Sequence, residues 1–392
     1  MKAENLNNRK TQVVFITHYN AMNGANQSLL LLLKGIRKLI DIKMVYIYNQ
    51  KEDEGLFKEL IEEQIPVSGI HCSSLFYSTS PFKLLISFPG KLLKNLSSLR
   101  KIAKYIKQEK IDLVYSNSSV ETLGVFVAKI TGIKHIWHVR EFGYDDYKLV
   151  HLGGKKVKRY FLKLSDSVIA ISKSIERYLN LKNAIQVYNP VFDETELSSR
   201  KIININQRTS LPNRLGMVGI ISETKNQKRG LEALKKLRDR GYNLSIEFWG
   251  EVASKEYYKA LLTYIERYNL TEYVFFKNFE KDKSKIYSGI DILLMCSMNE
   301  AFGRVTIEAM TFGAIVIGFD NAGTAEIITN GKNGLLYNDN TTTLEDQIIY
   351  CINNPSRYQE MRIDAESFSK KFTVRQHVHS ITNVILSVFG RR

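Results

Sequence analysis

Short apolar runs alternate with segments of helical periodicity along the first half of the chain. Runs with the length and β-branched content of buried strands lie near 12–17, 43–48, 111–116, 133–139, 167–172 and 185–188. Helical segments fill the intervals between them. Such alternation is typical of a parallel sheet covered by helices. The sequence therefore predicts an α/β fold.

A polar stretch from Ser198 to Ser210 interrupts this alternation and predicts a linker. Further strands are expected near 214–219, 244–249, 273–277, 291–296, 314–319 and 334–337. A chain of 392 residues exceeds what one hydrophobic core usually supports. We therefore expect two domains, residues 1–195 and 196–373. The final segment, 374–392, places apolar side chains at helical spacing and predicts one more helix.

Cysteine usage and hydropathy bear on the compartment. The three cysteines lie far apart, are odd in number and lack metal-ligand spacing, which favours a reduced setting. The polar N-terminus lacks the long apolar region of a signal peptide. No apolar run reaches the roughly 18–20 residues that span a bilayer. We expect a cytoplasmic protein, soluble or peripheral on the inner face of the cell membrane.

The net charge of +16 is distributed unevenly. Residues 1–195 carry 29 basic against 18 acidic side chains, which predicts an acidic partner for this half. Within it, residues 82–110 hold eight basic residues against Glu109, interleaved with leucine and phenylalanine. This composition predicts a helix that binds an anionic membrane surface, with a second basic cluster at 155–159 extending it. A solvated helix face is the alternative.

Candidate chemistry gathers after the run 291–296. Glu300 lies in the following loop, Gly303 makes a tight turn, and Glu308 lies more than one turn into a helix. Ligands of open α/β sheets bind outside the carboxyl ends of strands, where a helix N-terminus favours an anion. The two carboxylates can then accept from sugar and ribose hydroxyls. The alternative is a helix cap and a solvated face.

Three other strand ends carry polar groups. Lys225, Lys228 and Arg229 follow the run at 214–219 and suit a phosphate, although a lysine-rich surface loop is the alternative. Gly24 follows the first strand, where a glycine lets backbone N–H groups approach a phosphate; the alternative is a plain tight turn. His138, Arg140 and Glu141 end the run at 133–139, and the sequence does not decide whether Arg140 and Glu141 pair or contact a substrate.

Residues 300–337 resemble glycosyltransferase family 4. The family pattern Glu-x-x-x-x-x-x-x-Glu-Ala-Met matches Glu300 to Met310, and a strand with flanking glycines, a Glu-Ile pair at 326–327 and a Gly-Leu pair at 334–335 follow. The turn before the first helix also resembles the family's Gly-Gly-Ala turn, with Asn23 in place of the first glycine. Three further stretches depart from the pattern. Ala314-Ile315 stands in the usual Pro-Val neighbourhood, Asn321-Ala322-Gly323 replaces a double glycine, and Ile220 stands where the family has an arginine.

The resemblance implies a GT-B architecture, that is, two facing Rossmann-like domains with a C-terminal helix crossing back to the first. It also implies a retaining glycosyltransferase that moves a sugar from a UDP- or GDP-sugar to a glycan or lipid-linked acceptor in bacterial surface polysaccharide assembly, without a metal or other cofactor. The implied catalytic residues are Glu300, His138 and Lys225. The implied donor-binding residues are Gly24, Ala301, Phe302, Gly303, Arg304, Glu308, Lys228 and Arg229, and the acceptor side has Arg140 and Glu141.

Two other functions stay open at this point. A nucleotide-sugar epimerase or phosphorylase would use the same scaffold. A basic nucleic-acid-binding protein with a silent enzyme-like site would also fit the net charge, but the sequence contains no recognised nucleic-acid-binding motif. We therefore expect a nucleotide-sugar donor, an acceptor and a membrane surface as partners, and no nucleic acid.

Overall fold

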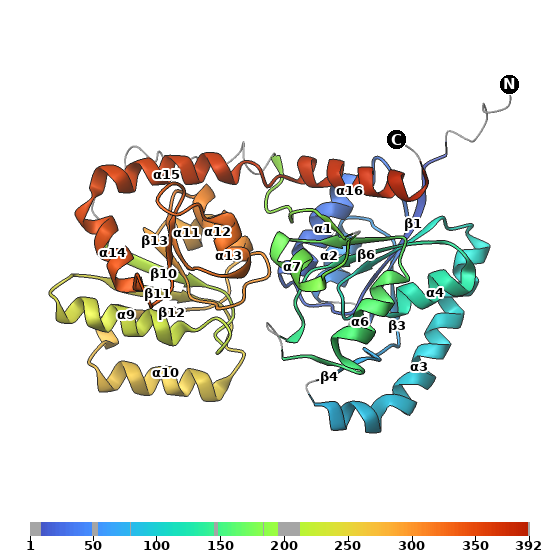
Figure 1. The fold of residues 1–392 in the computed structure, drawn as a ribbon, viewed down its shortest axis with the longest axis horizontal. Coiled ribbons are helices and arrows are strands. Elements are labelled where there is room, and N and C mark those ends of the chain that lie inside the picture. The colour runs from blue at the N-terminus through green and yellow to red at the C-terminus, as the bar shows by residue number, and fades with distance from the viewer. Residues whose placement is uncertain are drawn as a thin grey trace. The chain divides into compact units, whose positions relative to one another are not determined.

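The computed structural model describes residues 9–48, 54–78, 80–144, 148–182, 184–194 and 212–390. The chain separates into two compact units, one formed by Met1–Glu194 with Thr373–Arg392 and the other by Thr195–Phe372. The predicted linker, Ser198 to Ser210, lies outside the described residues. Each unit is built around one large parallel sheet, as the alternation of apolar runs predicted (Figure 1).

The first unit contains a seven-stranded sheet in the order β3-β2-β1-β5-β6-β8-β9. Its strands are β1 (Gln12–Thr17), β2 (Asp41–Tyr48), β3 (Val67–Ile70), β5 (Leu113–Asn117), β6 (Lys134–Val139), β8 (Ser167–Ala170) and β9 (Ala184–Gln186). Its helices are α1 (Gly24–Ile36), α2 (Gly55–Glu62), α3 (Pro81–Gln108), α4 (Leu123–Thr131), α6 (Gly154–Lys163), α7 (Lys173–Leu179) and α16 (Val374–Val388). A short antiparallel pair joins β4 (Tyr77–Ser78) to β7 (Val150–His151).

The strands of this sheet are buried on both faces. In β1, Val13 and Phe15 join the apolar cluster that contains residues of α1, α2 and α16, whereas Val14 and Ile16 join the cluster that contains residues of α3 and α4. Successive side chains of a strand point to opposite faces, so an uninterrupted apolar run is what a doubly covered strand requires. The central strands could therefore be predicted from their uninterrupted apolar runs.

The C-terminal helix belongs to the first unit, as expected. Apolar side chains of α16 pack into the cluster formed by β1, α1 and α2, and they include Val374, Val378, Ile381, Val384 and Ile385. Gly35 of α1 allows close packing, because a Cβ atom there would lie 2.7 Å from side-chain atoms of Val374 and Val378. Figure 1 shows α16 lying beside α1.

The second unit has a six-stranded sheet in the order β12-β11-β10-β13-β14-β15. The strands are β10 (Arg214–Val218), β11 (Ser245–Trp249), β12 (Val274–Lys277), β13 (Ile292–Met295), β14 (Ile315–Phe319) and β15 (Leu335–Tyr337). The helices are α9 (Gln227–Asp239), α10 (Lys255–Arg267), α11 (Lys283–Tyr287), α12 (Arg304–Thr311), α13 (Ala322–Ile327), α14 (Leu344–Asn353) and α15 (Pro355–Ser369), with a 3₁₀ turn at Thr271–Tyr273.

Every apolar run identified in the sequence corresponds to a strand, but β3, β4 and β7 were not predicted. β3 reads Val-Ser-Gly-Ile, and its serine and glycine break the apolar pattern. β4 and β7 are two residues each, which is too short for a periodicity to register. These strands are held by pairing with distant segments rather than by local preference.

Burial also sets the expected pH dependence of the first unit. Burial lowers the pKa of His135 to about 3 and that of His151 to about 4, and it lowers the pKa values of His18 and His138 as well. The second unit, Thr195–Phe372, contains no histidine. The unfolded chain takes up protons on these side chains near pH 6.5, and the folded first unit resists doing so.

We predict that acidification from pH 7 to pH 5 destabilises the first unit, because its stability is lost as the pH falls below the unfolded value of about 6.5. His135 and His151 alone would contribute a loss of about 3 kcal/mol. Glu121, whose pKa burial raises, opposes part of this loss. Urea unfolding followed by hydrogen exchange, with peptides of the second unit as internal control, measures the difference. Equal pH sensitivity of the two units would contradict it.

Candidate functional site

The strand order of the second unit reverses between β10 and β13. From β10 the chain moves outward through β11 and β12, and then returns to place β13 on the other side of β10. Helices that leave in opposite directions open a crevice at the carboxyl ends of the two strands, and open α/β sheets bind ligands at such a point. The loops after β10 and β13 contain Lys225 and Glu300, respectively.

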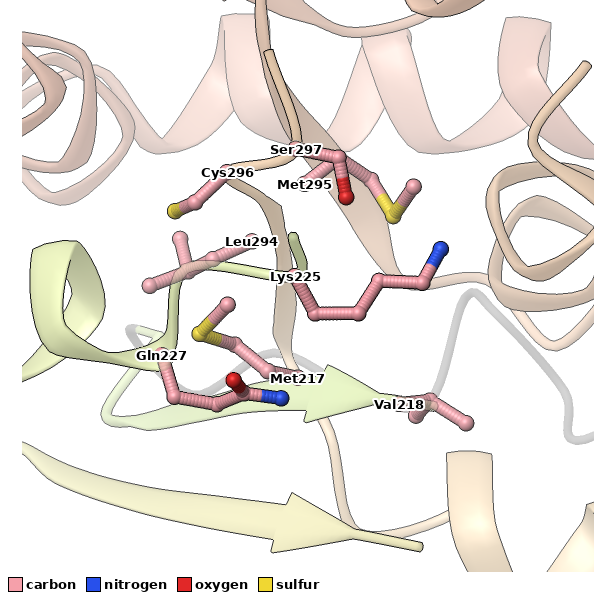
Figure 2. A pocket seen from close by; sticks show the side chains of 8 residues that line it. All are labelled: Met217, Val218, Lys225, Gln227, Leu294, Met295, Cys296 and Ser297. Carbon is pink, nitrogen blue, oxygen red and sulfur yellow. The ribbon is translucent and has the colours of Figure 1, made fainter. Parts of the chain in front are cut away.

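Lys225 and Glu300 meet across this point. The Nζ atom of Lys225 donates to Oε2 of Glu300 at 2.6 Å, and the two side chains keep 26% and 17% of their surface exposed. A small pocket lies under Lys225 and is lined by Met217, Val218, Gln227 and residues 294–297. Figure 2 shows the lysine side chain extended between the end of β10 and the β13 residues. The two predicted catalytic residues of this unit therefore form one charged pair.

The Glu300 loop is fixed by the N-cap and first turn of α13. The amide of Gly323 donates to the carbonyl of Glu300 at 2.8 Å, and a Cβ atom at Gly323 would lie 2.7 Å from that same oxygen. Asn321 Nδ2 donates to the carbonyl of Met298 at 2.9 Å. Glycine at 323 is therefore required by the close approach of two backbones. Ala322 occupies the position of the other family glycine with φ of 49°, a strained conformation for a residue with a Cβ atom.

Gly303 forms the N-cap of α12. Its φ of 89° lies in the left-handed region, which favours glycine, and it turns the chain so that the helix starts at Arg304. Phe302 is buried and its ring packs against Phe372 at a centroid distance of 5.8 Å. Ala301 is half-buried beside Glu300. The first turn of α12 thus directs its N–H groups and positive dipole end toward the Glu300 loop.

Glu308 lies at the centre of a buried charge cluster. Its Oε1 atom is 3.2 Å from Nζ of Lys283 and 3.5 Å from Nη2 of Arg304, and its Oε2 atom accepts from the hydroxyl of Tyr287 at 2.9 Å. Burial raises the pKa of Glu308, but the charges of Lys283 and Arg304 outweigh this effect and hold the pKa below its ordinary value. Glu308 is therefore ionised at neutral pH.

The other predicted donor-side residues of this unit have different surroundings. Arg229 binds the carboxylates of Asp339 and Glu345, which ties α9 to the segment around α14. Lys228 is largely exposed and lies 3.9 Å from Glu232 on the same helix. Ile220, in the position of the family arginine, is 45% exposed. The cations that the structure places against Glu300 and Glu308 are Lys225, Lys283 and Arg304.

The first unit presents its own polar groups where its strand order reverses, between β1 and β5. Gly24 is exposed at the start of α1, and the side chain of Asn23 caps this helix by accepting from the amide of Asn26 at 3.0 Å. Asn23 therefore has a specific structural task where the family pattern has glycine. Asn26 in turn donates to the carbonyls of Tyr19 and Ala21, so the turn before α1 is rigidly held.

His138 is buried at the end of β6. Its Nδ1 atom lies 2.6 Å from the hydroxyl of Tyr115 and 3.3 Å from Nη2 of Arg140. A guanidinium only donates hydrogen bonds, so Nδ1 accepts and the proton of the neutral ring sits on Nε2. Burial, followed by the charge of Arg140 and by His377, lowers the pKa well below its ordinary value. In the described part of the chain, Nε2 is buried and has no hydrogen-bond partner.

Arg140 and Glu141 are both buried but contact different groups. Arg140 donates through Nε to Asn117 at 2.6 Å and through Nη1 to Asn189. Glu141 accepts through Oε1 from the hydroxyl of Ser118 at 3.0 Å and from the amide of Ser119 at 2.6 Å. Asn189 therefore orients Arg140. The terminal helix contributes His377, whose ring stacks on His138 at a centroid distance of 6.0 Å.

Sequence reasoning missed Lys283, Tyr287, Tyr115 and His377. Lys283 and Tyr287 stand on α11, directly after the loop at the carboxyl end of β12, and that position was the signal available in the sequence. Tyr115 and His377 reach His138 from a central strand and from the C-terminal helix, and no local pattern marks them. Within the described ranges, no group of three or more His, Cys, Asp or Glu side chains is arranged to hold a metal ion.

The predicted membrane segment is a single 28-residue helix, α3. Phe82, Leu85, Ile86 and Leu93 on its first half are 61–71% exposed. At the same three- and four-residue spacing, the exposed face continues with basic side chains on the second half, namely Arg100, Lys104 and Lys107. Lys91 differs, because its Nζ atom donates to the carbonyls of Ser74 and Tyr77. None of the described helices is long and apolar enough to cross a membrane.

The second basic cluster, residues 155–159 on α6, is only partly exposed. Lys155 and Lys156 are exposed, and Lys155 lies over the ring of Tyr178. Lys158 is buried and donates to the carbonyl of Phe142 at 3.2 Å. This cluster therefore offers fewer exposed charges than its sequence suggested.

Comparison with known proteins identifies the family of each half of the chain. Residues 22–191 match the model of Glycosyltransferase Family 4, and residues 198–368 match that of Glycosyl transferases group 1. An uncharacterised glycosyltransferase of Methanocaldococcus jannaschii is 26% identical over 359 residues, which is 89% of this chain and 91% of that protein.

Solved glycosyltransferase structures share the fold of this chain. The structure of Anabaena HepE in complex with UDP and glucose matches with a TM-score of 0.76 at 20% identity, covering 96% of this chain and all of that one. The apo lipopolysaccharide outer core galactosyltransferase WaaB matches with a TM-score of 0.70 at 16% identity, covering 96% and 99%. Two family models that together span most of the chain, and a fold shared with these enzymes, show that the chain belongs to the group 1, family 4 glycosyltransferases, has the GT-B fold and is a transferase enzyme.

Proposed function

We propose that this enzyme transfers a sugar from a nucleoside diphosphate sugar, a UDP-sugar first among them, to a hydroxyl group of a glycan or lipid-linked acceptor in bacterial surface polysaccharide assembly, with retention of anomeric configuration. The observation that carries the proposal is the pair of carboxylates around the N-terminus of α12. Glu300 is held by Lys225, and Glu308 is ionised among Lys283, Arg304 and Tyr287. Anion-binding and hydroxyl-binding groups therefore lie next to each other.

This arrangement suits a sugar nucleotide. The ionised Glu308 would accept from ribose hydroxyls, and Glu300 from hydroxyls of the donor sugar. Lys225 and the start of α12 would stabilise the diphosphate as it leaves, since preorganised positive groups act most strongly where charge develops. In the reaction, the bond from the anomeric carbon to the diphosphate breaks, a bond to the acceptor oxygen forms, and the acceptor proton passes to the diphosphate. The absence of a metal requirement remains part of the proposal.

The relatives support the donor and the pathway class. The Anabaena structure contains UDP and glucose, and WaaB is described as a lipopolysaccharide galactosyltransferase.

In the first unit, the neutral His138 holds an N–H group with no partner in the described residues, which could donate to a sugar oxygen. Gly24 would approach the phosphates, and Arg140 and Glu141 would serve the acceptor side. An epimerase on this scaffold would need no acceptor, so acceptor-dependent product formation separates the two functions.

We also propose that α3 binds an anionic membrane surface. Its exposed apolar side chains would enter the interface, and Arg100, Lys101, Lys104 and Lys107 would face acidic headgroups. Each basic residue near such a surface is worth roughly 1 kcal/mol. The enzyme would then contact a lipid-linked acceptor at the membrane surface that holds the lipid. We favour a membrane over a nucleic acid because apolar side chains stand on the same helix as the basic ones.

The first test is nucleotide binding. We expect the wild-type protein to bind UDP in calorimetry, and Glu308→Gln to weaken this binding about tenfold to a hundredfold, because a charge-assisted hydrogen bond contributes about 1.5–3 kcal/mol. Glutamine is preferable to alanine, since Glu308 also compensates two partly buried cations. Lys283→Met, which removes a neighbour but leaves the carboxylate, should retain UDP binding. Unchanged affinity of a folded Glu308→Gln protein would refute the role.

The second test concerns Lys225. Lys225→Met should lower kcat by about 10²–10³, because it removes one preorganised charge from the leaving group. Lys235→Met, on helix α9 that follows the Lys225 loop and paired with Asp239, is the matched control and should remain near wild type. Product formation followed by NMR reports the rate and the anomeric configuration together. Inversion at the anomeric carbon would rule out retention, and near-normal turnover would transfer the charge role to Arg304 or Lys283.

The third test concerns the membrane. We expect cosedimentation with vesicles that contain anionic lipid but not with zwitterionic vesicles, and the attraction should weaken with salt as the Debye length shortens. The variant Arg100→Glu, Lys101→Glu, Lys104→Glu should lose most of the binding. The matched control, Lys255→Glu, Lys259→Glu, Arg267→Glu on α10, changes the net charge equally and should keep it. Equal loss in both variants would leave α3 as a solvated helix.

A further inference from the structure

Buried polar atoms without partners gather at one place in the first unit. β1, β5 and β6 are neighbours in the sheet, so the residues that follow their carboxyl ends lie on adjacent strands about 4.8 Å apart. Those residues are His18, Ser119 and Glu141. In the described part of the chain, the Nδ1 atom of His18 is buried without a partner, and the buried hydroxyls of Ser119 and Tyr77 have no partner other than each other.

These groups belong to one cluster. Glu141 raises the pKa of His18 against the larger lowering effect of burial, and it adds to the effect of burial in raising the pKa of Tyr77. A hydrogen bond from the Ser119 hydroxyl lowers the pKa of Tyr77, against the larger effect of burial. Geometry agrees, because a Cβ atom at Gly143, two residues after Glu141, would lie 3.9 Å from Cε1 of Tyr77. His18, Tyr77, Ser119 and Glu141 thus come together from four separate segments. Tyr77 comes from β4, which is held to β7 by pairing with His151.

The backbone beside the cluster is strained. Ser118 has φ of 144°, which residues with a side chain rarely adopt. Three hydrogen bonds hold it there: the indole of Trp137 donates to its carbonyl at 2.7 Å, its hydroxyl donates to Glu141 at 3.0 Å, and the amide of Val120 donates to that hydroxyl at 3.1 Å. This conformation brings the amide of Ser119 to Glu141. Strain combined with unpartnered buried groups is costly to the fold, and such costs are typical of binding sites.

The chemistry of the cluster favours an uncharged, hydroxyl-rich ligand. Two hydroxyl groups and a neutral imidazole can each donate or accept, and the Glu141 carboxylate accepts. The Glu141 carboxylate acts on both His18 and Tyr77, which disfavours a phosphate between them. The cation nearby, Lys158, lies 5.8 Å from the centroid of the Tyr77 ring and donates to the carbonyl of Phe142. Beside His18, the ring of Tyr19 is half-exposed, at a centroid distance of 6.1 Å, and offers a flat apolar surface for the face of a sugar ring.

We infer that His18, Tyr77, Ser119 and Glu141 form a subsite for one uncharged sugar residue of the acceptor. This inference rests on the proposed glycosyl transfer and adds to it the part of the acceptor that is recognised, namely a sugar ring rather than a phosphate or lipid group. Ser119 and Tyr77 determine acceptor specificity by hydrogen bonding. Neither is required for the donor, whose candidate carboxylates lie in the other unit.

The experiment compares Ser119→Ala and Tyr77→Phe with wild type. Acceptors are a panel of p-nitrophenyl glycosides of glucose, galactose, mannose and N-acetylglucosamine, and the readouts are glycoside-dependent UDP release, UDP affinity and thermal stability. We expect each variant to lower kcat/KM for the stimulating glycoside about threefold to tenfold, and the double variant to lower it further. UDP affinity should stay within twofold. Stability should change little, because each hydroxyl has at most the other as a partner within the described residues.

Ser167→Ala is the matched control. Ser167 is also buried and its hydroxyl also has no partner in the described residues, but it starts β8 and so lies at the amino end of that strand. Ser167→Ala should match wild type both in the kcat/KM for the stimulating glycoside and in UDP affinity. Two results would overturn this inference alone. The first is that Ser119→Ala and Tyr77→Phe keep the wild-type kcat/KM for the glycoside. The second is that the wild-type protein binds UDP but no glycoside of the panel stimulates UDP release. A wild-type protein that does not bind UDP overturns the proposed function and this inference with it.

Discussion

Parallel strand pairing is the constraint on which the rest of this structure depends. Every strand pair of the two large sheets is parallel, so in each unit all the carboxyl ends lie on one edge. A strand buried on both faces has no room for polar side chains within it, and the first positions free to carry them are the loops beyond that edge. Candidate residues as distant in sequence as Lys225 and Glu300 are brought together by this rule, and specific contacts then refine their positions.

The two units offset the free-energy cost of burying polar groups in different ways. In the second unit the ionised groups are paired: Glu308 has two cations and a phenol, and Glu300 has Lys225. Charges paired in this way are held in place before any ligand arrives. The first unit instead keeps His18 and His138 neutral by burial, and leaves a ring nitrogen of each without a partner in the described residues. Fixed charge suits a diphosphate, and neutral donors and acceptors suit hydroxyl groups.

The sequence predicted features in which the signal is local. Apolar runs predicted the central strands, and the glycine and glutamate spacing after β13 predicted the turn at Gly303 and the helix that carries Glu308. Features that depend on distant partners could not be predicted. Arg229 was expected to face a phosphate, yet it binds Asp339 and Glu345, more than 100 residues away. Lys283 could not be distinguished from other lysines, because only the folded sheet brings it to Glu308.

The departures from the family pattern differ in what replaces the lost residue. Asn23, in place of a glycine, caps α1, so the turn is kept by a different interaction. Ala322, in place of another glycine, keeps the positive φ and carries the strain, because Gly323 beside it must still meet the carbonyl of Glu300. Ile220, which is 45% exposed, places an apolar side chain where the family has an arginine, and a cation on the same loop is Lys225, whose Nζ atom donates to Glu300. Two further cations reach the neighbouring carboxylate from other segments, because Lys283 of α11 and Arg304 of α12 both lie against Glu308.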